Sequence, residues 1–165
     1  MTSKLRSMHK EDRSGLAGLL AGIPSFDTED QAVALELVDI ALSDADQNDY
    51  LFVLAVNVND QPIGYACYGP TPLTDGTYDL YWIAVSADLA GKGIGTSLLR
   101  AVEEDLRRRK GRMLIIETSS SEAYDKTRQF YLKNGYPLTE TIKDFYRPGE
   151  DRVTFIKRLD QPASF

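Results

Sequence analysis

The sequence has little of what metal centres, disulfides and membrane segments are built from. Among its 165 residues there is one cysteine, Cys67, and one histidine, His9. An internal disulfide is therefore impossible, and a metal site of the usual ligands has little support. No apolar run approaches the ~20 residues that cross a bilayer, and the first residues lack the apolar core of a signal peptide. We expect a protein without a bound metal, away from the membrane and in the cytoplasm.

The charge is also one-sided. Twenty-five acidic residues against 19 basic ones give a formal net charge of −6, which disfavours binding to nucleic acid. The densest basic run, Arg107 to Lys110, falls at the end of a predicted helix, where cations complement the negative end of the helix dipole. We predict no nucleic-acid partner, and the acidity is compatible with a cationic amine substrate.

Hydrophobic periodicity predicts one α/β domain over residues 1–165, with no linker or repeat. The second helix is expected to begin at Thr28 as its N-cap, with Gln31 completing a capping box. The predicted order is β-α-α-β-β-β-α-β-α-β-β, which favours a mixed sheet of about seven strands flanked by four helices. The expected strands cover residues 4–8, 50–58, 63–68, 78–85, 113–117, 138–144 and 153–159, and the expected helices cover 11–21, 28–43, 94–110 and 121–134.

The most informative stretch is a strand that runs into a glycine-rich loop and then a helix. The strand covers 78–85, and Gly91, Gly93 and Gly95 alternate in the loop directly before the helix. Glycines leave room for an anion beside backbone N–H groups, and the first helical turn adds further free donors and a positive dipole end. The spacing fits neither the dinucleotide fingerprint nor the P-loop. A phosphate site of another kind is indicated, with an ordinary glycine-rich turn as the alternative.

Two motifs resemble those of the GNAT family of N-acetyltransferases. Residues 90–95 are similar to the family's pyrophosphate loop, [Q/R]-x-x-G-x-[G/A], although Ala90 replaces the usual Gln or Arg. Residues 128–136 are similar to the A-x-x-F/L-Y-x-x-x-G-F motif. The motifs occur in the family's order, and the element order matches along nearly the whole chain. The resemblance implies the GNAT fold and acetyl-CoA as cosubstrate.

The resemblance also assigns residues to the coenzyme. A bulge in the strand before the loop would free backbone groups at Ile83, Ala84 and Val85, and the Val85 N–H is the candidate oxyanion donor. The loop would bind the diphosphate, with Lys92 adding a positive charge. Tyr124 stands where many relatives place an asparagine that contacts the pantetheine arm. The implied coenzyme-binding set is Ile83, Ala84, Val85, Ala90, Gly91, Lys92, Gly93, Ile94, Gly95, Thr96 and Tyr124.

Three side chains are candidates for catalysis. Tyr131 matches the family tyrosine that protonates the departing thiolate, and its alternative role is to anchor a helix. Asp79 matches the position of the base in histone-type members, and Glu117 the position used by ribosomal-protein-type members. Either carboxylate could instead be a solvated strand end, and an amine of low pKa needs no base.

The implied function is transfer of an acetyl group from acetyl-CoA to a primary amine of a small molecule or a protein N-terminus. The alternative is a catalytically weak member that binds acetyl-CoA as a sensor or interaction module, an alternative motivated by Ala90 and Tyr124. The expected partner is a small-molecule or peptide amine. Dimers are common in the family, so a homodimer is one expected assembly.

Overall fold

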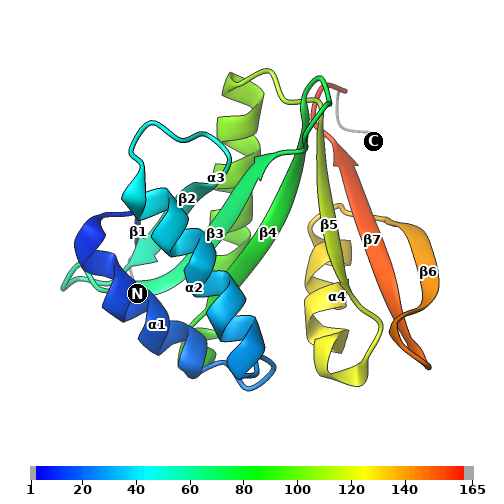
Figure 1. Ribbon diagram of the computed structural model, residues 1–165, viewed down its shortest axis with the longest axis horizontal. Helices are drawn as coiled ribbons and strands as arrows, with labels where there is room; N and C mark the ends of the chain where they lie inside the picture. Colours follow the sequence, from blue (N-terminus) through cyan, green and yellow to red (C-terminus); the bar gives the residue numbers. More distant parts are fainter. Residues whose placement is uncertain (1–2, 162–165) are drawn as a thin grey trace.

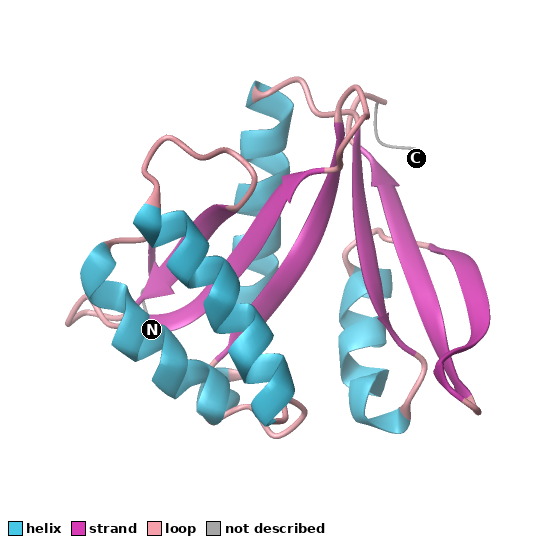
Figure 2. Ribbon diagram, viewed as in Figure 1, coloured by secondary structure: helices cyan, strands magenta, loops and turns pink. Residues whose placement is uncertain are grey.

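Seven strands form one mixed sheet in the computed structural model, which describes residues 3–161 (Figures 1 and 2). The sheet order is β1-β2-β3-β4-β5-β7-β6, and among the described strands only β4 and β5 pair in parallel. The predicted order of elements and the predicted mixed sheet are confirmed. The predicted domain, 1–165, includes residues 1–2 and 162–165, which lie outside the described residues. The strands are β1 Lys4–Arg6, β2 Leu51–Val56, β3 Pro62–Pro70, β4 Thr77–Val85, β5 Met113–Ser119, β6 Leu138–Arg147 and β7 Glu150–Arg158.

Helices cover both faces of the sheet. On one face α1 (Arg13–Ala21) and α2 (Thr28–Ser43) pack on β2 and β3. On the other face lie α3 (Ile94–Arg108) and α4 (Asp125–Lys133). The apolar side chains of α3 are buried, because their spacing of three and four residues keeps them on one side of the helix: Ile94, Leu98, Leu99, Val102 and Leu106. None of the helices in residues 3–161 has the length and apolar character needed to cross a membrane.

The start of α2 differs from the prediction. Asp27, not Thr28, is the N-cap, because Asp27 has extended backbone angles while Thr28 is already helical. The Asp27 carboxylate accepts the Asp30 N–H at 2.8 Å, and the Asp30 carboxylate accepts the Asp27 N–H at 3.0 Å. Gln31 instead donates to the carbonyl of Phe26 at 3.2 Å. The prediction of Thr28 and Gln31 was wrong, since two carboxylates at the positive end of the helix form the same reciprocal cap.

The sheet is closed at one end of the β4–β5 pair and open at the other (Figure 1). The two strands pair only between residues 77–80 and residues 113–116. A bulge in β4 follows, because Tyr68 pairs with Leu80 and Cys67 with Trp82, which leaves Tyr81 as an extra residue. Such a bulge bends a strand away from its neighbour. Residues 82–85 of β4 therefore have β3 on one side and, within the described part of the chain, no paired strand on the other.

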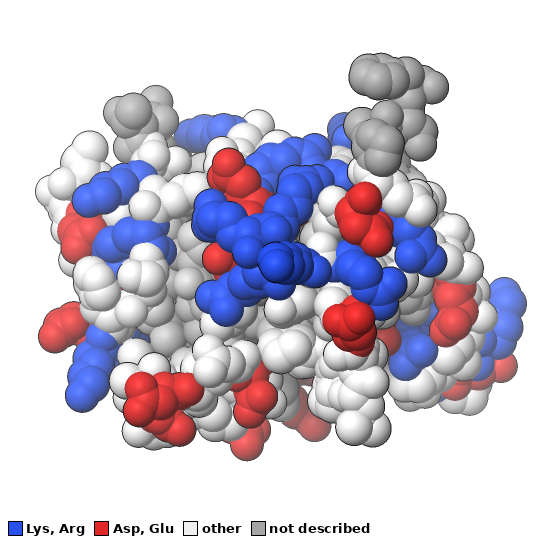
Figure 3. Space-filling view, turned by 90° about the horizontal axis from the view of Figure 1, so that it is seen from above, with Lys and Arg blue, Asp and Glu red and all other residues white. Residues whose placement is uncertain are grey.

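Basic residues gather at the end of the molecule where α3 terminates, as Figure 3 shows from that side. Arg107 lies 4.0 Å from Glu103, Arg108 3.5 Å from Asp105, and Arg109 2.8 Å from Asp105. These are pairs within one or two helical turns, so the basic run is partly neutralised by its own helix. The glycine loop lies at the other end of α3.

Candidate active site

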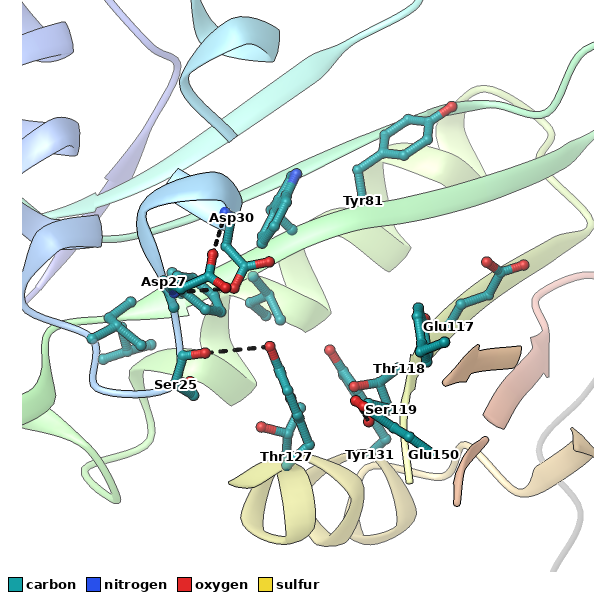
Figure 4. A pocket seen from close by; sticks show the side chains of 18 of the residues that line it. Ser25, Asp27, Asp30, Tyr81, Glu117, Thr118, Ser119, Thr127, Tyr131 and Glu150 are labelled. Carbon is teal, nitrogen blue, oxygen red and sulfur yellow. Dashed lines mark hydrogen bonds between the residues drawn. The ribbon is translucent and has the colours of Figure 1, made fainter. Parts of the chain in front are cut away.

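A cavity of about 520 Å³ lies where β4 and β5 have separated. Its walls come from five parts of the chain: the open end of β4, the end of β5, the start of α4, the α1–α2 connection and the β6–β7 hairpin (Figure 4). The strands of a sheet are held at fixed spacing only where they pair, so a cavity within the sheet needs the divergence seen here.

The wall from β4 presents free main chain to the cavity. Ile83, Ala84 and Val85 all line the cavity. The N–H of Ser86 donates to the Ile63 carbonyl of β3 at 2.9 Å. Because backbone groups in an antiparallel pair point alternately toward and away from the partner strand, Val85 and Ile83 turn theirs away from β3. That direction is the side on which β5 has departed, so these groups are available to a ligand.

Tyr131 reaches the cavity from α4. The residue is only 5% exposed and packs against the rings of Tyr136 and Phe155, with centroids 6.4 and 5.6 Å away. Burial raises the pKa of the Tyr131 phenol, so the hydroxyl stays protonated throughout the neutral range. Its side chain lines the cavity (Figure 4), and its hydroxyl takes no hydrogen-bond partner within the part of the chain from 3 to 161.

The two candidate bases occupy different places. Glu117 lies one residue beyond the part of β5 that pairs with β4, lines the cavity and has a side chain that is 45% exposed, with an Arg152 nitrogen 3.6 Å from its carboxylate. Asp79 lies in the paired part of β4, opposite Ile115, and its carboxylate accepts a hydrogen bond from the Thr71 hydroxyl at 2.6 Å. The cavity lining includes Glu117 and does not include Asp79.

The glycine loop lies beside the cavity rather than in its wall. Gly91 and Gly93 have φ of 77° and 86°, and a Cβ added to either would meet no atom within 4 Å. This open cradle precedes the free N–H groups of the first turn of α3, a combination that fits a diphosphate. A Cβ at Gly95 would lie 3.2 Å from the Phe130 ring and 3.7 Å from Val85. The first turn of α3 therefore touches both the helix of Tyr131 and the β4 wall.

The other loop residues differ in what they expose. Ala90, Lys92 and Thr96 are exposed, whereas the side chain of Ile94 is buried in the core and leaves only main chain for a ligand. Tyr124 does line the cavity, and its hydroxyl donates to the carbonyl of Ser25 at 3.4 Å. That hydrogen bond joins the start of α4 to the α1–α2 connection across the cavity (Figure 4).

Several lining residues were not found from the sequence. Asp27 and Asp30 belong to the cap of α2, and Arg147 and Glu150 belong to the β6–β7 hairpin. Acidic residues are common at helix starts, so in the sequence this pattern does not distinguish a site from an ordinary cap. Tyr81 and Trp82 are neighbours on the bulged strand, and both lie along the cavity.

Comparison with known proteins agrees with this geometry. Residues 17–136 match the model of the acetyltransferase (GNAT) family. A GNAT-family protein from Desulfovibrio desulfuricans is 38% identical, with a TM-score of 0.91 over 96% of this chain and 99% of that chain. No curated protein matches the sequence. The chain belongs to the GNAT family of acetyltransferases, which confirms the predicted family and enzyme class.

More distant structures share the fold. The ribosomal-protein-S18-alanine N-acetyltransferase from Escherichia coli is 16% identical, with a TM-score of 0.76 over 99% of this chain and 97% of that chain. An aminoglycoside 6'-N-acetyltransferase in complex with coenzyme A is 15% identical, with a TM-score of 0.74 over 98% of this chain and 99% of that chain. These two enzymes act on very different amines, so the shared fold leaves the acceptor undetermined.

Proposed function

We propose that this protein transfers the acetyl group of acetyl-CoA to a primary amine of a small molecule or a peptide. The observation that carries the proposal is the convergence, in one cavity, of three groups: the β4 main chain that is not paired with β5, the Tyr131 hydroxyl, which has no partner among residues 3–161, and the Glu117 carboxylate. The coenzyme A complex of the aminoglycoside acetyltransferase supports the choice of coenzyme.

The chain offers a continuous path for the coenzyme. The diphosphate would lie on Gly91, Gly93 and the first turn of α3, with Lys92 adding a positive charge. Because Gly95 approaches Val85, the loop leads directly to the β4 wall. The pantetheine arm would follow residues 83–85 and pass Tyr124, so that the thioester lies beside Tyr131. Ala90 contributes no side-chain hydrogen bond, so the loop holds the diphosphate mainly through main chain.

The reaction then follows from the residues around the thioester. The neutral amine attacks the acetyl carbon, and the developing oxyanion accepts a hydrogen bond from the Val85 N–H. The carbon–sulfur bond breaks, and the thiolate takes the Tyr131 proton. The nitrogen loses its proton to Glu117, directly or through a water. Glu117 then releases its proton to solvent and Tyr131 takes one up from solvent, which completes the cycle.

The test compares Tyr131→Phe with Tyr78→Phe, which removes a hydroxyl at the closed end of the same sheet. Coenzyme release would be followed over a panel of amines, and acetyl-CoA affinity by calorimetry. We expect Tyr131→Phe to lower kcat roughly 10- to 100-fold with affinity unchanged. Tyr78→Phe should leave both near wild type. Tight acetyl-CoA binding with no turnover of any amine would favour the alternative, a coenzyme-binding sensor.

The use of acetyl as the acyl group, the cytoplasmic location and the homodimer stay predictions.

A further inference from the structure

The carboxylates that line the cavity differ in whether a basic side chain lies near them. Four carboxylates line it, and Arg147 is the basic residue among the lining residues that the structure describes. The Arg147 guanidinium lies 2.8 Å from the Glu150 carboxylate, which also accepts the Ser119 hydroxyl at 2.6 Å. Glu117 has Arg152 nearby. Across residues 3–161, Asp27 and Asp30 form no ion pair and are hydrogen-bonded only to each other's N–H.

The pair formed by Asp27 and Asp30 carries more negative charge than the helix end requires. A helix N-terminus is equivalent to roughly half a positive charge, against two carboxylates here. Burial raises the pKa of the Asp30 carboxyl, and the charges of Asp27 and Glu29 raise it further, although the hydrogen bond from the Asp27 backbone opposes them. Burial also raises the pKa of the Tyr124 phenol, with Asp30 and Asp27 next in effect. The negative charges of Asp27 and Asp30 are therefore felt by groups inside the cavity. A cation bound there would reduce the repulsion between the two carboxylates.

Tyr131 indicates a ligand independently of these acids. The Tyr131 side chain is nine-tenths buried and lines the same cavity, and its hydroxyl has no hydrogen-bond partner within the described residues. A hydroxyl that opens into a cavity without a protein partner is free to bind a ligand or water. The cavity therefore suits a bound ligand, and the negative charges of Asp27 and Asp30 favour a cationic one.

We propose that the acceptor is a di- or polycationic amine whose second ammonium group is bound by Asp27 and Asp30. This inference rests on the proposed function. The reacting amine would lie beside Glu117 and lose its charge before attack, while the remote amine stays protonated. Asp27 and Asp30 lie at the start of α2, across the cavity from Glu117 on β5 (Figure 4). A monoamine can satisfy only one of these two sites, whereas a flexible diamine satisfies both.

The test removes the two charges and keeps the helix cap. The double variant Asp27→Ser, Asp30→Gln retains a capping box, because serine at the N-cap and glutamine three residues later form the same reciprocal hydrogen bonds. Glu29→Gln removes one charge from the same helical turn at a residue that does not line the cavity. Spermidine serves as the polycationic acceptor and hexylamine as the monocationic one. Thermal unfolding checks each fold, and Asp30→Gln alone replaces the double variant if that variant does not fold.

We expect wild type to have a higher kcat/KM for spermidine than for hexylamine. The double variant should lose about 10- to 100-fold for spermidine and less than about two-fold for hexylamine, since a hydrogen-bonded ion pair contributes on the order of this factor. Calorimetric titration of spermidine into the protein with coenzyme A should show the same loss of affinity. Glu29→Gln should stay close to wild type in both measurements.

The outcomes separate this inference from the proposed function. Acetylation of hexylamine as efficient as that of spermidine, or equal losses in the double variant and Glu29→Gln, would overturn the polycation proposal and leave acetyl transfer standing. If neither amine is acetylated, the calorimetric titration decides. Spermidine binding that depends on Asp27 and Asp30 supports the charge site, and no binding overturns it.

Discussion

The two ends of the β4–β5 pair are made from the same strands but differ in role: one end is paired and buried, and the other lines the cavity. At the closed end, residues 77–80 and 113–116 are hydrogen-bonded and Leu114 is fully buried. At the open end, residues 82–85 still pair with β3 but no longer with β5, and they face a cavity with carboxylates and the phenol of Tyr131. The difference arises from one extra residue, Tyr81, and from the pairing that stops after Leu80.

Along β4, one segment serves folding stability and the next serves the chemistry of the cavity. Paired backbone groups are satisfied by one another and have nothing left to offer a ligand. Unpaired groups are unfavourable unless a ligand or water takes them, which makes them suited to hold an oxyanion. We therefore expect substitutions at the closed end to reduce folding stability and those at the open end to reduce catalysis.

The largest expected effect is at the closed end. Leu114→Ala removes a fully buried side chain from the core under α3 and should lower the free energy of unfolding by about 2–5 kcal/mol. Ile83→Ala at the open end should cost less, because that side chain is only half-buried. Urea denaturation measures both. If Ile83→Ala lowered the free energy of unfolding as much as Leu114→Ala, stability would not differ between the two ends of the β4–β5 pair.

The next effect compares the two candidate bases. Glu117→Gln should reduce kcat/KM about 10-fold or somewhat more, because it removes the carboxylate that lines the cavity. Asp79→Asn keeps an oxygen that can accept the Thr71 hydrogen bond, so its activity should stay within about two-fold of wild type. Steady-state kinetics with one amine are sufficient. A larger loss for Asp79→Asn than for Glu117→Gln would assign the base to the closed end.

The smallest effect concerns the loop that continues from the open end. Gly91→Ala creates no clash, because nothing lies within 4 Å of the added carbon, but φ is 77° there. A left-handed alanine costs about 1 kcal/mol, and we expect acetyl-CoA to bind several-fold more weakly by calorimetry. Gly18→Ala is the matched control, since Gly18 lies in α1 with equally open space and no positive φ. That change should stabilise the fold by about 0.5–1 kcal/mol. Equal effects of the two substitutions would show that backbone conformation does not matter at Gly91.

The sequence was most informative where a local rule was enough. Alternating glycines between a strand and a helix indicated a phosphate cradle, and both Gly91 and Gly93 have positive φ. The buried stripe of α3 followed from its period. The cap of α2 was assigned one residue too late, because Thr28 and Asp27 both suit an N-cap and only the backbone angles of Asp27 distinguish them.

The amino-acid sequence by itself determined the order of the elements, the glycine cradle and the membership of a family of acetyltransferases, because periodicity and motif spacing are properties of neighbours along the chain. Only the tertiary structure decided which carboxylates meet the cavity. Glu117 reaches it and Asp79 does not, since pairing between β4 and β5 ends between their positions. Asp27 and Asp30 reach it because the chain just before α2 packs against the bulged strand, where the Phe26 and Trp82 rings lie 5.3 Å apart, a long-range contact that no local pattern encodes.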